Sequence, residues 1–175
     1  MSKTKIAPVA ASSGVGLGWA LATLLRDYQT QVEAALAGLP GGARAFLVMT
    51  HVDKETCRSQ IAIAEQVGLD KTTLTYLLDD LERDGLIKRT TDPNDRRSRH
   101  ISLTAVGSKA LARYFRAVEQ VDQQILARLG VEDAAQFQLS LMKVAGLEGQ
   151  SMQDATDGEH SAHICQATMG VNAEA

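Results

Sequence analysis

The residues best suited to chemistry are three arginines, Arg96, Arg97 and Arg99, in a polar turn that opens with Asp92-Pro-Asn-Asp95. Proline and short polar side chains favour a tight turn, and unpaired guanidinium groups are rarely buried. Guanidinium groups bind phosphate, and they are attracted to a DNA minor groove of strong negative potential. The turn therefore indicates either a basic finger aimed at nucleic acid or an ordinary solvated hairpin.

Short runs of strand character lie on both sides of this turn. Residues 86–90 contain apolar and β-branched residues at strand length, and after the turn Ile101 and Leu103 alternate with polar neighbours. Alternation with a period of two is typical of a half-buried strand. We therefore predict a β-hairpin whose tip carries the arginines.

Two short helices are predicted just before the hairpin. Thr56 or Ser59 is a suitable cap for the first, and Gly68-Leu69 turns the chain. Asp70 is a suitable cap for the second, in which leucines recur at i, i+3, i+4 and i+7. Two helices joined by a tight turn form a helix-turn-helix, whose second helix enters the DNA major groove. Residues of this helix with side chains suited to bases or phosphates are Lys71, Thr72, Thr73, Thr75 and Tyr76.

Longer helices flank this central region. Helical periodicity predicts one helix over residues 17–38, a short one over 43–52, a long one from 105 to about 129, and a last one from 132 to about 147. We expect Thr104 to cap the long helix. Because the terminal helices lie at opposite ends of the folded region, we expect that sequence neighbours alone do not bury their apolar stripes and that a second copy covers them.

Composition limits the possible classes of protein. The net charge is −3, but residues 149–175 hold four of the 21 acidic residues and no Lys or Arg, which leaves 17 acidic residues against 18 basic ones in the rest of the chain. No apolar run approaches the roughly 20 residues that span a bilayer, so we expect a cytoplasmic protein with no membrane partner. Two cysteines, Cys57 and Cys165, are too few for a disulfide framework.

The sequence resembles the MarR family of bacterial transcriptional regulators. The resemblance rests on the run from Leu69 to Arg89, on Asp92-Pro-Asn-Asp-Arg-Arg97 and on Leu103-Thr-Ala-Val-Gly107. It implies a homodimer that binds a pseudo-palindromic duplex, with Arg97 in the minor groove and Asp95 holding the wing in shape. It also implies that Gln60 joins the residues of the second helix that face the DNA. Asp79 and Asp80 depart from the family pattern, because they make the later half of that helix acidic.

Three further sets of residues have side chains that are capable of chemistry. Trp19, Arg26 and His51 are candidates for an effector crevice, since relatives bind small aromatic or anionic molecules between the dimer helices and the DNA-binding lobe. Metal ligation by His160, His163 and Cys165 is disfavoured, because the surrounding sequence has little to position ligands. Lys54 and Arg58 would favour a reactive Cys57 thiolate, but we favour a packing role for this residue.

The predicted fold class is mainly α with a β-hairpin wing, a winged helix-turn-helix flanked by N- and C-terminal dimerisation helices. We expect a flexible arm over residues 1–16, the domain over 17–148 and a flexible acidic tail over 149–175. Within the domain, we place the winged helix-turn-helix at about 43–103 and the dimerisation helices at about 17–38 and 105–147.

The predicted function is a DNA-binding repressor released by a small-molecule effector, with double-stranded DNA and a second copy as partners. We expect no catalytic residues, no metal and no cofactor. Two alternatives remain. An architectural DNA-binding protein would bind unrelated duplexes almost equally, and a protein-interaction module would lack the steep salt dependence of phosphate binding.

Overall fold

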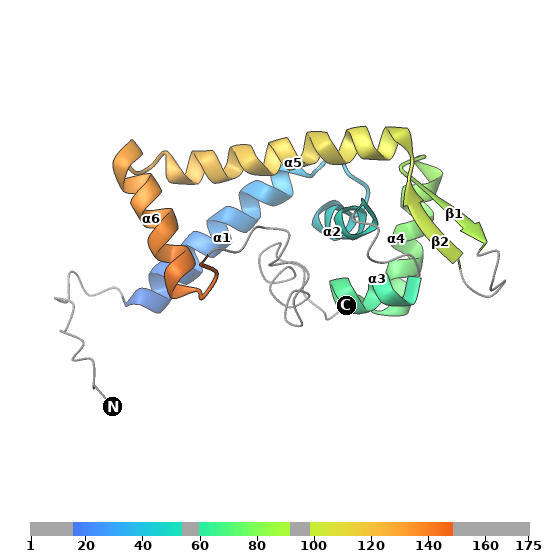
Figure 1. The fold of residues 1–175 in the computed structure, drawn as a ribbon, viewed down its shortest axis with the longest axis horizontal. Coiled ribbons are helices and arrows are strands. Elements are labelled where there is room, and N and C mark those ends of the chain that lie inside the picture. Colours follow the sequence, from blue (N-terminus) through green and yellow to red (C-terminus); the bar gives the residue numbers. More distant parts are fainter. Residues whose placement is uncertain (1–15, 54–59, 92–98, 149–175) are drawn as a thin grey trace, which may run out of the picture.

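The computed structural model describes residues 16–53, 60–91 and 99–148. It is mainly helical with one antiparallel hairpin (Figure 1), so the predicted fold class is confirmed. In chain order the elements are α1 (Leu17–Ala35), α2 (Gly42–Asp53), α3 (Gln60–Val67), α4 (Lys71–Arg83), β1 (Ile87–Thr91), β2 (Arg99–Leu103), α5 (Ala105–Leu126) and α6 (Val131–Val144).

The predicted helices and strands are present, with small shifts at their ends. The long helix α5 ends at Leu126 rather than near residue 129, because the chain turns at Ala127. The hairpin pairs Ile87 with Leu103 at its base and Thr91 with Arg99 at its far end. The predicted caps Thr56 and Ser59 lie outside the described residues, whereas Asp70 and Thr104 both act as caps.

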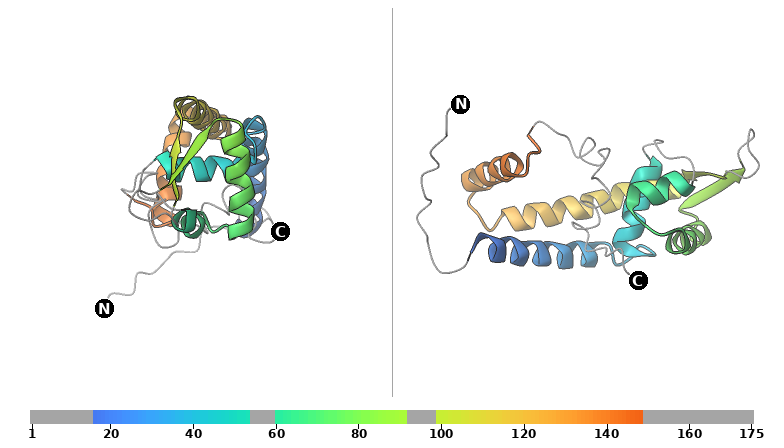
Figure 2. Two further views of the ribbon diagram at one scale, coloured as in Figure 1. Left: turned by 90° about the vertical axis from the view of Figure 1, so that its right-hand side faces the viewer. Right: turned by 90° about the horizontal axis from the view of Figure 1, so that it is seen from below.

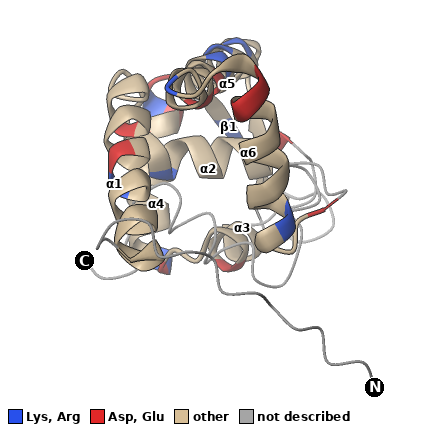
Figure 3. Ribbon diagram, turned by 90° about the vertical axis from the view of Figure 1, so that its left-hand side faces the viewer, with Lys and Arg blue, Asp and Glu red and all other residues tan. Residues whose placement is uncertain are grey.

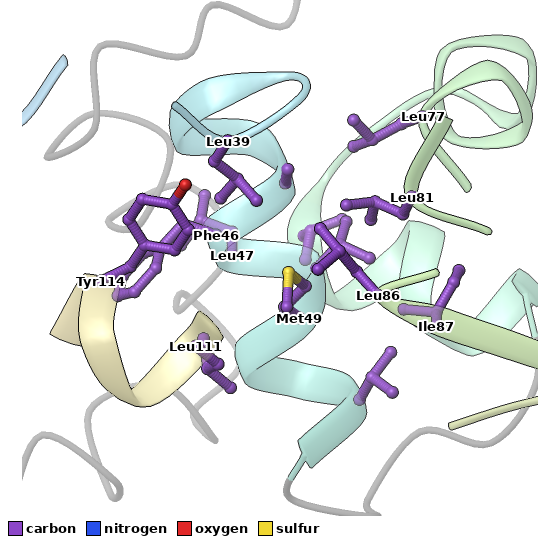
Figure 4. Close-up of a cluster of buried hydrophobic side chains, with 14 of the residues drawn as sticks. Leu39, Phe46, Leu47, Met49, Leu77, Leu81, Leu86, Ile87, Leu111 and Tyr114 are labelled. Carbon is purple, nitrogen blue, oxygen red and sulfur yellow. The ribbon is translucent and has the colours of Figure 1, made fainter. Parts of the chain in front are cut away.

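The core is built around α2, which packs against α3, β2 and α5. Phe46 and Met49 of α2 are buried at its centre, and Leu81 and Leu111 approach them from α4 and α5 (Figure 4). The ring of Phe46 also meets Phe115 edge to face, with centroids 4.9 Å apart. Through these contacts α2 forms the common support of the helix-turn-helix and the hairpin.

The start of α5 is held directly against the start of the hairpin. The backbone N–H of Thr104 donates to the carbonyl oxygen of Leu86 at 3.0 Å. Gly107 approaches the same carbonyl so closely that a Cβ atom there would lie 1.8 Å from the oxygen. Only glycine allows this approach, which fixes the base of the hairpin relative to α5.

The terminal helices bury each other more than we expected from the sequence. Helices α1 and α5 pack side by side (Figure 2), and their contact buries Val32 of α1 and Val118 and Val121 of α5. The expectation that a second copy covers these stripes is therefore wrong for the residues buried between α1 and α5. The physical reason is that the chain folds back, so helices distant in sequence become neighbours. Helix α6, in contrast, has no buried residue.

Polar contacts lock α1 and α5 together. Arg128 and the Asp27 carboxylate form an ion pair at 2.5 Å, and the hydrogen bond from Arg128 lowers the pKa of Asp27. Tyr28 donates to Asp122, and burial together with this carboxylate raises the pKa of the Tyr28 hydroxyl. Burial also raises the pKa of Asp122.

Among the described residues no helix is both long and apolar enough to cross a membrane.

Candidate DNA-binding surface

Helix α4 begins at a well-formed cap. The Asp70 carboxylate accepts hydrogen bonds from the backbone N–H groups of Thr72 and Thr73, at 2.9 and 3.0 Å. The Thr73 hydroxyl also bonds this carboxylate, and these contacts lower the pKa of Asp70. The cap satisfies N–H groups that the helix itself leaves unpaired. It therefore fixes where the first turn of α4 points.

The two faces of α4 have opposite roles. The predicted leucine stripe is buried: Leu74, Leu77, Leu78 and Leu81. On the other face Lys71 and Thr72 are exposed, and Tyr76 keeps 69% of its surface accessible. An exposed aromatic residue next to a lysine at a helix N-terminus offers a hydrogen-bonding hydroxyl, a cation and partial positive charge. This face is suited to phosphates and base edges.

The other predicted contact residues on α3 and α4 are bonded within the protein. Gln60 Nε2 donates to Thr75 Oγ1 at 2.7 Å, and Thr75 Oγ1 donates to the carbonyl oxygen of Lys71 at 2.7 Å. Thr73 is half-buried with its hydroxyl on Asp70. Gln60 and Thr75 therefore join α3 to α4, a role that the sequence did not suggest.

Arginines offset part of the negative charge in the acidic half of α4. Asp79 pairs with Arg89 of β1 at 2.6 Å, and Asp80 pairs with Arg83 at 2.7 Å. A carboxylate paired with a guanidinium group repels phosphate less than a bare one does. The departure from the family pattern at these two positions is thus compensated by neighbouring arginines of the same chain.

Sequence patterns did not predict the contact between Glu82 and Arg89, which links α4 to the hairpin. Glu82 accepts from the Arg89 guanidinium at 2.8 Å and from the Arg89 backbone N–H at 3.1 Å. The hydrogen bond from this guanidinium lowers the pKa of Glu82. The available signal was a carboxylate in the last helical turn followed, beyond Gly85, by an arginine in the strand. The link holds β1 at a set angle to α4.

The tip of the hairpin lies outside the described residues. Asp95, Arg96 and Arg97 fall in the seven positions between Thr91 and Arg99, the last pair of the hairpin register. Arg99 is the first residue of β2. Their roles in DNA binding stay predictions.

The three predicted effector residues do not lie together within one chain. Trp19 and Arg26 are exposed on α1, with Trp19 73% accessible near its start. His51 is 1% accessible in the core, near the end of α2. A hollow of about 420 Å³ near the end of α2 is lined instead by residues such as Asp53, His100 and Ser108. The effector assignment stays a prediction.

The residues weighed for metal and redox chemistry are not among those that the structure describes. No group of three or more His, Cys, Asp or Glu residues is placed there to hold a metal ion. His160, His163, Cys57 and Cys165 lie outside the described residues.

The comparisons with known proteins agree with this geometry. The MarR family model matches residues 43–98. The transcriptional regulator HosA of Escherichia coli O111:H- is 33% identical over 99 residues, which are 57% of this chain and 73% of HosA.

Solved structures share the fold. A mutant MarR from E. coli superimposes with a TM-score of 0.67 and 23% identity, over 77% of this chain and 99% of that one. The same mutant complexed with operator DNA has a TM-score of 0.57 and 23% identity, over 73% of this chain and 92% of that one. A Mycobacterium tuberculosis MarR family protein in complex with p-aminosalicylic acid has a TM-score of 0.59 and 24% identity, over 75% of this chain and 99% of that one.

Helix α4, supported by α3 and followed by the hairpin, defines a winged helix-turn-helix protein. The chain belongs to the MarR family and is a DNA-binding transcriptional regulator, in a family whose members are not enzymes.

Proposed function

We propose that the protein is a homodimeric repressor whose two α4 helices read successive major grooves of a pseudo-palindromic operator. The observation that carries this proposal is the exposed face of Lys71, Thr72 and Tyr76, presented at the capped N-terminus of a helix whose other face is fully buried. The two helices would lie about 34 Å apart, one turn of DNA. Arg97 would anchor the wing in the adjacent minor groove.

Dimerisation is supported by apolar surface at the end of the molecule away from the hairpin. Leu17, Trp19 and Leu21 of α1 are exposed, and Val131 and Val144 of α6 are 91% and 85% accessible. Large apolar patches on a folded chain mark association surfaces. We assign the helices over residues 17–38 and 105–147 to the dimer, and residues 43–103 to the DNA-binding lobe.

Release by a small molecule is the regulatory part of the proposal. It is supported by the related M. tuberculosis protein solved with p-aminosalicylic acid. A ligand acts only through its different affinities for the two dimer arrangements. We assign Trp19 and Arg26 to the site, with His51 acting from the core.

The decisive experiment is selection of bound fragments from genomic DNA by the purified protein, followed by fluorescence anisotropy on the enriched sequence. We expect a preference of roughly 10³ or more over unrelated duplexes, with affinity that falls steeply as salt rises. Arg97→Ala should weaken binding at least tenfold and leave the dimer intact, while Lys143→Ala on α6 serves as a control. A flat salt response, or equal binding of all duplexes, would contradict the proposal.

The effector is tested with p-aminosalicylate as the probe. Saturating probe should lower operator affinity, and Arg26→Ala should reduce this response without changing the affinity measured in its absence. If operator affinity is the same with and without the probe, this anion is not an effector of the protein.

A further inference from the structure

Helix α5 carries a basic stripe on its solvent side. The stripe consists of Lys109, Arg113 and Arg116, spaced at i, i+4 and i+7 along one side of the helix. The three side chains border a hollow of about 450 Å³, whose apolar lining is Leu86, Val106 and Ala110. Val106 is exposed although it is apolar. In Figure 3 the blue segments of α5 lie at the outer edge of the fold.

Unlike several other arginines, those of the stripe have no partner carboxylate within the described residues. Arg83, Arg89 and Arg128 each pair with at least one carboxylate. On the stripe, Arg113 lies over the ring of Tyr114, 4.7 Å from its centroid, and Arg116 Nε donates to the carbonyl oxygen of Ala112 at 3.2 Å. These contacts orient the side chains but leave their charge uncompensated.

The stripe is also remote from the proposed DNA contacts. Its hollow is lined by Leu86, which follows the C-terminal end of α4. Lys71 lies at the N-terminal end of α4, and the two ends of this helix are about 18 Å apart. Helix α3 and the start of α4 lie on the opposite side of the molecule from α5 (Figure 1). A duplex bound to α4 would therefore leave the stripe uncovered.

The chain itself contains a segment of complementary charge. Residues 149–175 hold four carboxylates and no Lys or Arg. Three of these, Asp154, Asp157 and Glu159, fall within six consecutive positions. Met152 and Ile164 flank them and could cover the apolar lining of the hollow. The segment thus offers three clustered anions, as many as the cations of the stripe.

The segment is long enough to reach the stripe. Arg113 precedes the end of α5 by a rise of about 20 Å, and α6 adds about 20 Å in a different direction (Figure 1). The direct path from Glu148 to Arg113 is then on the order of 30 Å. An extended chain from Glu148 to Asp157 spans roughly 30 Å, and one to Glu159 spans more.

We propose that the acidic segment 149–175 docks on the basic stripe of its own α5 and shields Lys109, Arg113 and Arg116 from nucleic acid. An open row of cations outside the helix-turn-helix would bind any duplex through phosphates, without regard to sequence. Docking confines DNA binding to α4 and the wing, and so raises the preference for the operator. This role rests on DNA binding by the family, but the docking itself is tested without DNA.

Carbodiimide cross-linking followed by mass spectrometry tests the docking. The reagent joins a carboxylate to a lysine amine with loss of water, and Lys109 is the lysine of the stripe. We expect links from Lys109 to Asp157 or Glu159, the carboxylates far enough along the chain to reach it, at low salt, and their loss at about 0.5 M salt, where screening is strong. Lys143, nearer to the segment in sequence, is the control. Links that favour Lys143 over Lys109 would overturn the proposal.

Mixing isotopically light and heavy protein identifies the chain that supplies the segment. Cross-links that join two light peptides or two heavy peptides support docking of the segment on the α5 of its own chain. Links that join light to heavy peptides would assign the segment to a second copy instead and overturn docking within the chain.

Binding to an unrelated 20-base-pair duplex at about 50 mM salt tests the shielding. Either removal of residues 149–175 or the combined change Asp154→Asn, Asp157→Asn and Glu159→Gln should raise affinity roughly three- to tenfold. The gain should disappear when Lys109, Arg113 and Arg116 are all changed to Gln. A gain that persists in that background would place the action of the segment elsewhere, and no gain at all would refute shielding. The segment variants keep the test valid if the α5 variant does not fold.

Discussion

Glu82 and Arg89 join the recognition helix to the wing through both backbone and side chain. The carboxylate of Glu82 accepts the backbone N–H of Arg89 with one oxygen and its guanidinium with the other. The Arg89 side chain is only 13% accessible, and it also reaches Asp79. One arginine therefore pairs with two carboxylates of α4, offsets part of their negative charge and sets the angle of the hairpin.

Glu82→Ala should lower the free energy of unfolding by about 1 kcal/mol, because a half-buried arginine and a backbone N–H lose an ionised acceptor. Urea unfolding followed by circular dichroism measures this change. Arg83→Ala is the control, since Arg83 is exposed and its partners among the described residues are Asp80 and Asp84 beside it. Equal losses of unfolding free energy in the two variants would mean that the link between Glu82 and β1 does not stabilise the fold.

The same carboxylate should make stability depend on acid pH. The pKa of folded Glu82 lies below its ordinary value of 4.5, so its ionised form adds stability above about pH 4.5. This contribution is lost as pH falls through the lowered pKa. The difference in melting temperature between the wild type and Glu82→Ala should therefore shrink from pH 6 to pH 3. A difference that grows toward acid pH contradicts the assigned direction.

Gln60 and Thr75 should be energetically coupled. Thr75→Val keeps the shape of the side chain but removes the oxygen that accepts from Gln60. In a double-mutant cycle with Gln60→Ala we expect a coupling of about 1 kcal/mol in unfolding free energy. The matched cycle of Gln60→Ala with Thr72→Val should give none. Additive effects in the first cycle would show that the contact does not join α3 to α4.

Gly107→Ala should destabilise the fold by about 2 kcal/mol or more, because the new Cβ atom would overlap the backbone of Leu86 and force α5 away from the hairpin. Thermal unfolding checks this. Gly130→Ala is the control, since a Cβ atom there meets nothing within 4 Å. A Gly107→Ala protein as stable as the Gly130→Ala protein would show that α5 shifts at no cost.

Leu21→Glu should weaken the dimer and, through it, operator binding. Leu21 lies on the same side of α1 as the core-facing Tyr28 but is 47% exposed, so a second copy is expected to cover it. Light scattering coupled to size-exclusion chromatography gives the mass. Thr30→Glu adds the same charge on the opposite side of α1 and should leave the dimer intact. A stable Leu21→Glu dimer would move the interface elsewhere.

Local patterns in the sequence predicted the elements of the fold well. Asp70 and Thr104 cap their helices as expected, because capping depends on residues only two or three positions away. The leucine stripe of α4 is buried for a similar reason, since helical periodicity alone selects one face. The exposed face with Lys71 and Tyr76 follows directly from that stripe.

Contacts between elements were the part that sequence patterns did not predict. The pattern of α4 gave no sign that Thr75 accepts a hydrogen bond from the Gln60 amide of another helix, and its contact with DNA stays a prediction. Asp79 looked like an uncompensated acid, yet Arg89 of β1 pairs with it. In the same way, α1 and α5 cover part of each other although the chain separates them widely.

The sequence by itself determined the order of helices and strands, their caps, the buried face of α4 and the basic turn, because these depend on neighbouring residues and on periodicity. Only the tertiary structure decided which polar side chains of α4 stay available and which are bonded to Gln60, Arg83 or Arg89. It also decided that the basic stripe of α5 stands apart from the recognition helix. Both depend on how distant segments pack, and packing brings together atoms whose separation along the chain carries no local signal.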